Sequence, residues 1–334
     1  MARVAVVLMN LGGPDSPAAV EPFLYNLFAD PMIIGLPAVL RLPLARLIAR
    51  LRARTAGDIY ARLGGASPLL ANTRAQADTL ERALGPGYRC FVAMRYWHPY
   101  SSQTAIDVKN WAADEIVCLP LYPQFSRTTT ASSLSAWRQA ASRCRLDLPC
   151  SIVASYPTEP GLIGAIAALI RSAMTSAGSA GKPPRLLLTA HGLPQKIVRA
   201  GDPYPAQVEA TAAAIIAALA CPGLDWRLCY QSRVGPLAWL GPATDLEIRR
   251  AGQDRVPLVV APIAFVSEHS ETLVELDLDY RKIAAESGVP SYCRIPTVST
   301  DPGFIAALAA LVERARSEHC IGMPAGCSRR EGPQ

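Results

Sequence analysis

The stretch Leu186-Leu-Leu-Thr-Ala-His-Gly-Leu-Pro194 joins a short apolar run to a loop that carries a histidine and a glycine. A run of this length that ends at Gly and Pro predicts a β-strand followed by a turn. A fully apolar strand is typical of a parallel sheet covered on both faces. Ligands of such sheets bind beyond the carboxyl ends of the strands, so His191 lies where a functional side chain is expected. Taken alone, this histidine could equally bond a buried backbone group.

The same alternation of short apolar strands and longer helical patterns runs through the whole chain and then repeats. It predicts the α/β class, with two similar doubly wound lobes of parallel sheet and right-handed crossovers. We place an N-terminal lobe at 1–158, a C-terminal lobe at 159–318 and a C-terminal tail at 319–334. The expected strands lie at 4–8, 90–94, 115–119, 151–154, 185–189, 226–230, 258–261 and 292–294.

Composition excludes several classes of protein. Half of the 334 residues are apolar, and a net charge of +6 carried mostly by Arg favours partners with carboxylates or lipid phosphates. No nucleic acid is expected, because the chain has no zinc finger and no basic run interleaved with aromatic residues. The apolar runs fall short of the roughly 18 to 20 residues of a membrane-spanning helix. The first residues lack a signal-peptide cleavage site, so we expect a cytoplasmic protein.

Acidic residues recur at spacings of three and four after the strand expected at 258–261. Glu268, Glu271, Glu275 and Asp279 fall on one stripe of a predicted helix, with His269 beside them. A solvated acidic face is the common alternative. Carboxylate and imidazole ligands suit a divalent cation such as Fe²⁺ at moderate affinity, whereas a cage of thiolates would hold it too firmly. The row therefore predicts a track for transient delivery of a cation.

The motif around His191 continues well beyond the loop. The run Thr189-Ala-His-Gly-Leu-Pro-Gln-Lys-Ile-Val-Arg-Ala-Gly-Asp-Pro-Tyr-Pro205 resembles the signature of the ferrochelatase family. The run Gln231-Ser-Arg-Val-Gly-Pro-Leu-Ala-Trp-Leu-Gly-Pro242 resembles its second-lobe loop. The resemblance extends in order from about residue 4 to about residue 312. Its other segments are 265–276, which resembles the acidic metal helix, and 10–14, 95–99 and 122–126.

The resemblance implies the chelatase fold of two flavodoxin-like lobes, with a porphyrin cleft between them. It implies a ferrochelatase that inserts Fe²⁺ into protoporphyrin IX, releasing two protons and forming haem b in the last step of haem biosynthesis. His191 and Glu271 correspond to the family's metal-binding and proton-handling pair, and Glu268 is a Glu where some members have Asp. With the acidic row, the predicted metal ligands are His191, Glu271, Glu268, His269, Glu275 and Asp279. The predicted porphyrin-binding residues are Leu11, Arg95, Tyr96 and Trp239.

Elementary chemistry supports these roles. A free-base porphyrin carries two inner N–H protons, and its planar ring hides the nitrogen lone pairs from an approaching cation. A neutral histidine can accept protons at pH 7, because its unperturbed pKa is about 6.5. Aromatic and aliphatic walls can hold the ring in a bent form. We expect no cofactor to be required for this chemistry, since Fe²⁺ is a substrate and no redox step is needed.

Nine cysteines without a signal peptide predict reduced thiols or metal ligands rather than a disulfide framework. Some ferrochelatases carry a [2Fe–2S] cluster, which needs four thiolates. Cys144, Cys150, Cys320 and Cys327 are the candidate ligands, although three closely spaced C-terminal cysteines are the pattern we expect. Free thiols are an equal alternative.

The segment 31–53 is strongly apolar with interspersed arginines. We interpret it as a lip that rests on the inner membrane surface, which makes the protein peripherally membrane-associated, although a buried helix pair is the alternative. Three further functions stay open: a coproporphyrin III ferrochelatase, a related cobalt or nickel tetrapyrrole chelatase, and a non-catalytic haem or metal carrier. The predicted partners are a porphyrin, Fe²⁺ and the membrane surface, and the oligomeric state is left open.

Overall fold

The computed structural model describes residues 2–177, 182–233, 235 and 237–324. The chain forms two compact units. The first contains Met1–Tyr156 and Leu308–Gln334, and the second contains Pro157–Ala307. The described part of the predicted tail, residues 319–324, therefore groups with the first unit, and so do residues 308–318, which we had assigned to the C-terminal lobe. The physical reason is a short strand, Cys320–Ile321, which pairs with the edge of the first sheet.

The first unit is built on a five-stranded parallel sheet of order β2-β1-β3-β4-β9. This is the order of flavodoxin-like doubly wound sheets. All seven residues of β1 are buried, as expected for a central strand covered on both faces. The predicted parallel sheet is thus confirmed for this unit. Its strands are β1 (Val4–Asn10), β2 (Tyr88–Met94), β3 (Glu115–Pro120), β4 (Cys150–Val153) and β9 (Cys320–Ile321).

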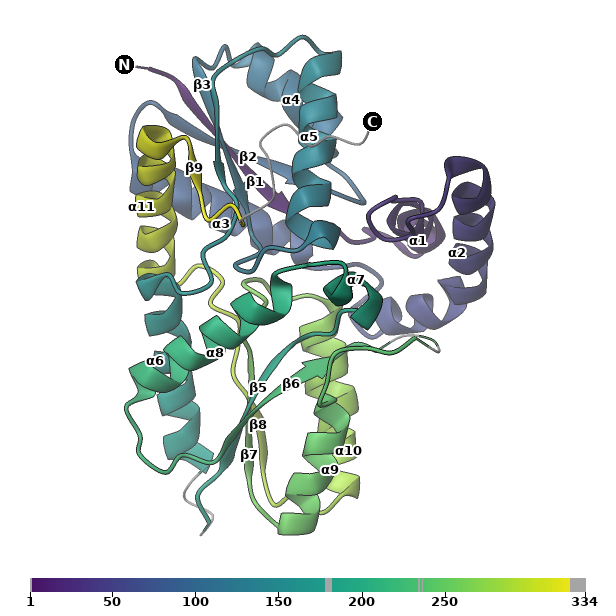
Figure 1. The fold of residues 1–334 in the computed structure, drawn as a ribbon, viewed down its shortest axis with the longest axis vertical. Helices are drawn as coiled ribbons and strands as arrows, with labels where there is room; N and C mark the ends of the chain where they lie inside the picture. The colour runs from purple at the N-terminus through teal and green to yellow at the C-terminus, as the bar shows by residue number, and fades with distance from the viewer. Residues whose placement is uncertain (1, 178–181, 234, 236, 325–334) are drawn as a thin grey trace. The chain divides into compact units, whose positions relative to one another are not determined.

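Helices connect these strands (Figure 1). The long helix α2 packs against α1, and it buries one face through Ala45 and Ala49. A single π-helical turn, Arg127–Ala131, leads into α5. The helices are α1 (Val20–Phe28), α2 (Ala38–Ala61), α3 (Leu69–Leu84), α4 (Ser101–Asn110) and α5 (Ser132–Arg143), with a 3₁₀ turn at Pro17–Ala19.

The second unit is built on a four-stranded parallel sheet of order β6-β5-β7-β8. Helices cover both of its faces, with α6 and α8 on one side and α9 and α10 on the other (Figure 1). The predicted parallel sheet is confirmed here as well. Its strands are β5 (Arg185–His191), β6 (Trp226–Gln231), β7 (Leu258–Pro262) and β8 (Tyr292–Arg294). Its helices are α6 (Pro160–Ala177), α7 (Gln195–Arg199), α8 (Tyr204–Leu219), α9 (Thr244–Asp254) and α10 (Tyr280–Glu286); α11 (Pro302–Glu318) begins here and ends in the first unit.

The acidic segment after β7 differs from the predicted α-helix. Glu271–Asp279 forms a π-helix, which continues into α10. Its i→i+5 hydrogen bonds widen the turn, and π-helical segments are rare and frequent at functional sites.

Helix α6 also differs from expectation, because it is the one helix among the described residues that is long and apolar enough to cross a membrane. The helix is 18 residues long, and it is longer than any uninterrupted apolar run in the sequence because it includes polar residues. Leu162, Ile166 and Ile170 are buried within the second unit, so α6 is a core helix of that unit.

Candidate active site

The predicted catalytic histidine ends β5, an interior strand of the second sheet. His191 is the last residue of β5, and it pairs with Gln231 at the end of β6. The next residue, Gly192, lies where a Cβ atom would come within 2.9 Å of the Gln231 carbonyl oxygen and 3.3 Å of the Trp239 ring. Only a glycine fits this approach. The Trp239 ring lies edge-on to the imidazole of His191, with ring centroids 6.5 Å apart.

The central carboxylate begins the π-helix. Glu271 Oε1 lies 3.5 Å from His191 Nε2, and Glu271 Oε2 lies 2.7 Å from His269 Nε2. The other ring nitrogen of His269 lies 3.1 Å from the Ser267 carbonyl oxygen, which accepts a hydrogen bond from it. The structure therefore brings three predicted site residues together, with one carboxylate between two imidazoles.

Electrostatics make His191 and Glu271 an ion pair. Burial alone would lower the pKa of His191, but the Glu271 carboxylate and the Gly192 carbonyl raise this pKa to about 9. Burial alone would raise the pKa of Glu271, but His191 and His269 hold it well below its usual range. The adjacent carboxylate therefore stabilises the imidazolium form of His191, whereas a histidine with an unperturbed pKa would be mostly neutral at pH 7.

A second carboxylate, Glu275, is saturated with hydrogen bonds. Its Oε1 accepts from the Ser232 backbone N–H at 2.8 Å and from the Tyr280 hydroxyl at 2.9 Å. Its Oε2 accepts from the Gln231 amide at 3.1 Å and from the Ser232 hydroxyl. Burial raises the pKa of Glu275. A cation could bind this carboxylate only by displacing some of these donors.

Glu268 faces a buried arginine instead of the His191–Glu271 pair. Its Oε1 accepts from Arg294 Nη1 at 2.6 Å and from the Thr297 backbone N–H at 2.9 Å. The same guanidinium binds Asp277 in the π-helix, with Nε 2.9 Å from Oδ1. Arg294 therefore ties the loop before the π-helix to the π-helix itself. Asp279, at the end of the π-helix, is half-buried.

The predicted porphyrin-binding residues of the first unit surround a buried aspartate. Arg95 Nη2 lies 2.8 Å from Asp30 Oδ2, and the Tyr96 hydroxyl donates to the same oxygen at 2.7 Å. Ser132 also donates to this oxygen. Tyr96 is fully buried, so its contact with a macrocycle stays a prediction. Leu11 is half-buried beside the cluster formed by α1 and α2.

The candidate cluster ligands do not form a site among the described residues. Cys327 lies outside the residues that the structure describes. Cys144 and Cys320 are half-buried at the edge of the first unit's core, and Cys150 is exposed. Within the described part of the chain, no three His, Cys, Asp or Glu side chains are arranged to hold a metal ion. The three described thiols therefore do not fit a [2Fe–2S] cluster by themselves.

Comparisons with known proteins identify the family of the chain. The ferrochelatase family model matches residues 3–316. The chain belongs to the ferrochelatase family. A ferrochelatase of Caulobacter vibrioides is 54% identical over 315 residues, covering 93% of this chain and 89% of the relative. A ferrochelatase of Phenylobacterium zucineum is 56% identical over 317 residues, covering 92% and 90%.

Solved structures agree on the fold alone. SirB from Bacillus subtilis with Fe³⁺ superposes with a TM-score of 0.57 at 13% identity, covering 95% of this chain and 98% of that chain. CbiX, the terminal enzyme for siroheme biosynthesis in denitrifying bacteria, gives 0.51 at 18% identity, covering 94% and 99%. The predicted chelatase fold is thus confirmed. As a ferrochelatase, the chain is a lyase that inserts Fe²⁺ into a porphyrin, the final step of haem biosynthesis. The family match favours this function over the carrier and the cobalt or nickel chelatase.

Sequence reasoning missed the residues that support the ferrochelatase site. Gln231 and Ser232 were interpreted only as part of a motif. Their position at the end of a predicted strand could have indicated that they contribute to the site. The roles of Arg294 and Asp30 could not be predicted from the sequence, because the residues that each contacts are far away in the chain.

Proposed function

We propose that His191 and Glu271 carry the insertion step, with protoporphyrin IX as the porphyrin. The 3.5 Å contact between His191 Nε2 and Glu271 Oε1 at the carboxyl end of β5 carries this proposal. Both side chains are partly exposed, at 38% and 28%, so a substrate can reach them. His269 holds the carboxylate from the other side, and the Ser267 carbonyl oxygen bonds the second ring nitrogen of His269. The site thus combines an imidazole with a fixed negative charge.

The ion pair sets the order of the proton steps. His191 is protonated at neutral pH and must lose this proton before it can bind a cation or accept a porphyrin proton. An arriving divalent cation repels the imidazolium proton, so metal arrival and proton release are coupled. The neutral imidazole can then take an inner N–H proton of the ring. Insertion of one Fe²⁺ releases two porphyrin protons.

We infer that Glu275 is a second contact for the cation, reached when some of the donors to its carboxylate are displaced. Glu275 lies four residues after Glu271 on the π-helix, and the Gln231 amide bridges the Glu275 carboxylate and the Glu271 carbonyl oxygen. Oxygen ligands bind Fe²⁺ at moderate affinity, which lets it move on. Ferrous iron enters as a substrate and no electron is transferred, so the proposed chemistry requires no resident cofactor.

An anaerobic metallation assay tests this function. The protein is mixed with Fe²⁺ and either protoporphyrin IX or coproporphyrin III, and a pH indicator follows proton release. We expect haem b from protoporphyrin IX, with two protons released per iron inserted. Faster turnover of coproporphyrin III would move the assignment to the alternative substrate. No haem from either porphyrin would contradict the proposed function.

We also propose that α2 rests on the cytoplasmic surface of the inner membrane. Four of its apolar side chains are exposed: Val39 at 79%, Leu40 at 59%, Leu47 at 55% and Leu51 at 72%. The exposed arginines Arg46, Arg50 and Arg54 lie among them on α2. A helix that exposes apolar side chains together with arginines can lie in the interface, with its apolar residues among acyl chains and its arginines near lipid phosphates. Porphyrins dissolve poorly in water, so a membrane-bound lip would keep the protein near its substrate.

Liposome flotation tests the membrane contact. Val39→Asp/Leu51→Asp should lose binding to vesicles that contain anionic lipid. Leu246→Asp is the matched control, because Leu246 is 53% exposed on α9 and lies in the second unit. Equal flotation of the double variant and the control would contradict the lip.

A further inference from the structure

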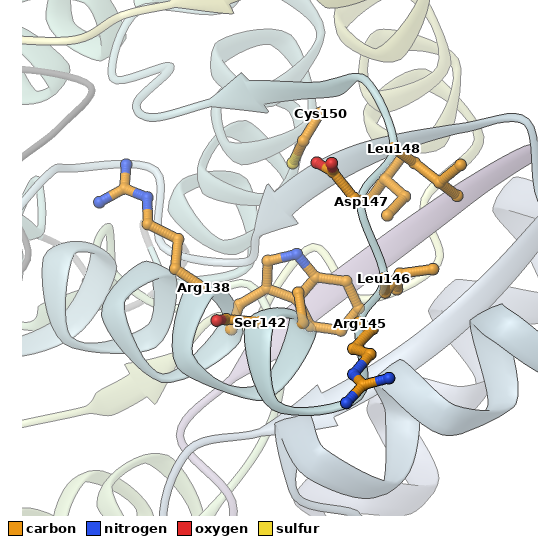
Figure 2. A pocket seen from close by; sticks show the side chains of 10 residues that line it. Arg138, Ser142, Arg145, Leu146, Asp147, Leu148 and Cys150 are labelled. Carbon is orange, nitrogen blue, oxygen red and sulfur yellow. The ribbon is translucent and has the colours of Figure 1, made fainter.

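A pocket lies in the first unit, formed by residues that the proposed chemistry does not use. It has a volume of about 380 Å³ and lies between α5 and the loop that leads into β4. Figure 2 shows Arg138 of α5 on one side and Asp147 and Leu148 of the loop on the other. Cys150 lines the same pocket, with its sulfur turned towards it.

Two thiols meet at this pocket. The sulfur atoms of Cys118 and Cys150 are 3.6 Å apart. Cys150 is the first residue of β4, and it pairs with Ile116 on the neighbouring strand β3. Cys118 lies two residues further along β3, so both side chains point to the same side of the sheet. The contact therefore follows from the strand register.

The two thiols differ in access. Cys150 is exposed and opens into the pocket, whereas Cys118 is fully buried among the core side chains. A small reagent can reach Cys150 only, and a modified Cys150 has Cys118 as its neighbour. Arg138 adds a cation to the pocket lining. A cation near a thiol favours the thiolate, which is the reactive form.

We propose that Cys150 is a site of reversible oxidation by small hydroperoxides, with Cys118 as the resolving thiol. Hydrogen peroxide is small enough to enter the pocket. It is also a product of the reaction of Fe²⁺ with oxygen, so an enzyme that uses ferrous iron is exposed to it. This site is independent of the proposed roles of His191 and Glu271.

The chemistry proceeds in two balanced steps. The Cys150 thiolate attacks one oxygen of the hydroperoxide, the O–O bond breaks, and the other oxygen leaves as an alcohol or water after taking a proton. Cys150 is then a sulfenic acid. Cys118 sulfur attacks the Cys150 sulfur, an S–S bond forms, and hydroxide leaves with the Cys118 proton as water. Two thiols are oxidised by two electrons, and one hydroperoxide is reduced.

The second step requires a small movement. The sulfur atoms must approach from 3.6 Å to about 2.05 Å. Cys150 stands at the start of its strand, directly after the loop residues 146–149, so its backbone can shift without breaking the centre of the sheet. A disulfide here would tie β4 to β3.

Peptide mapping of the full-length protein tests the site. The iron-free, reduced protein is treated with one equivalent of hydrogen peroxide, alkylated and digested without reductant. We expect a disulfide between the peptides of Cys118 and Cys150, and oxidation of Cys150 at least about ten times faster than that of exposed Cys221. In Cys118→Ala, Cys150 should stop at the sulfenic acid, which a 1,3-diketone reagent traps. Cys221→Ser is the matched control and should leave the disulfide unchanged.

Three results would overturn the proposal. One is oxidation of Cys150 no faster than that of Cys221. Another is a disulfide from Cys150 to Cys144 or Cys320 in place of Cys118. The third is acid-labile sulfide in the freshly purified protein together with a Cys150 that resists alkylation, since Cys150 would then be a cluster ligand. Circular dichroism of each variant ensures that the comparison is made on folded protein.

Discussion

Arg294 offers a sharp test of how the π-helix is held. Its guanidinium binds Glu268 in the preceding loop and Asp277 in the π-helix. Arg294→Met keeps the approximate length of the side chain and removes the buried charge that both carboxylates share. Arg281→Met is the matched control, because Arg281 contacts the same Asp277 at 3.9 Å but is 53% exposed.

The difference between the two variants follows from burial. The side chains of Arg294, Glu268 and Asp277 are only 7%, 19% and 25% exposed. Removing one partner of a buried ion pair costs about 3–5 kcal/mol, because an uncompensated charge remains. An exposed ion pair contributes about 0–1 kcal/mol. We therefore expect Arg294→Met to lose about 3–5 kcal/mol of local stability and Arg281→Met to lose at most about 1 kcal/mol.

Native-state hydrogen exchange measures this local stability without assuming that the two units unfold together. Since about 1.4 kcal/mol corresponds to a factor of ten, amides of the π-helix should exchange about a hundredfold to several thousandfold faster in Arg294→Met. In Arg281→Met the increase should stay below about tenfold. Equal protection in the two variants would refute the view that Arg294 holds the π-helix in place.

The remaining predictions concern His191 and the glycine after it. NMR titration of the His191 ring should give a pKa of about 9, and Glu271→Gln should lower this pKa, because burial remains while the adjacent carboxylate charge is lost. Since this pKa is raised, the stabilisation that protonated His191 contributes is complete below pH 6.5 and is lost as the pH rises through about 9; a wild-type pKa near 6.5 would contradict this. Gly192→Ala should displace Trp239 and lower metallation, whereas Gly164→Ala, where a Cβ meets nothing within 4 Å, should not, and equal activity would contradict the close approach.

Much of the fold could be predicted, because parallel strands are short, apolar and separated by helices. Strand β1 is buried at every position, and this single property fixes its place in a covered sheet. The return of the chain to the first sheet could not be predicted. Strand β9 has two residues, too few for any periodicity, and only its pairing with β4 reveals it.

The pairing of His191 with Glu271 could be predicted from the family resemblance, with His191 at the end of β5 and Glu271 in the segment after β7. The charge state of His191 could not, since it depends on a distance to Glu271 that no spacing in the sequence encodes. We predicted that all residues of the acidic row are metal ligands, yet their carboxylates have different hydrogen-bond partners. Glu268 pairs with Arg294, and Glu275 is fully bonded, because the three-dimensional neighbours of each carboxylate differ.

The central claim is that His191 and Glu271 insert the metal. The most direct measurement is the anaerobic rate of haem formation by His191→Ala/Glu271→Gln, with porphyrin binding followed separately by fluorescence and folding by circular dichroism. Glu286→Gln, an exposed carboxylate of α10, is the control. The account predicts that the double variant binds porphyrin, stays folded and forms no haem, while the control forms haem at the wild-type rate. Haem formation at the wild-type rate by the folded double variant would contradict it.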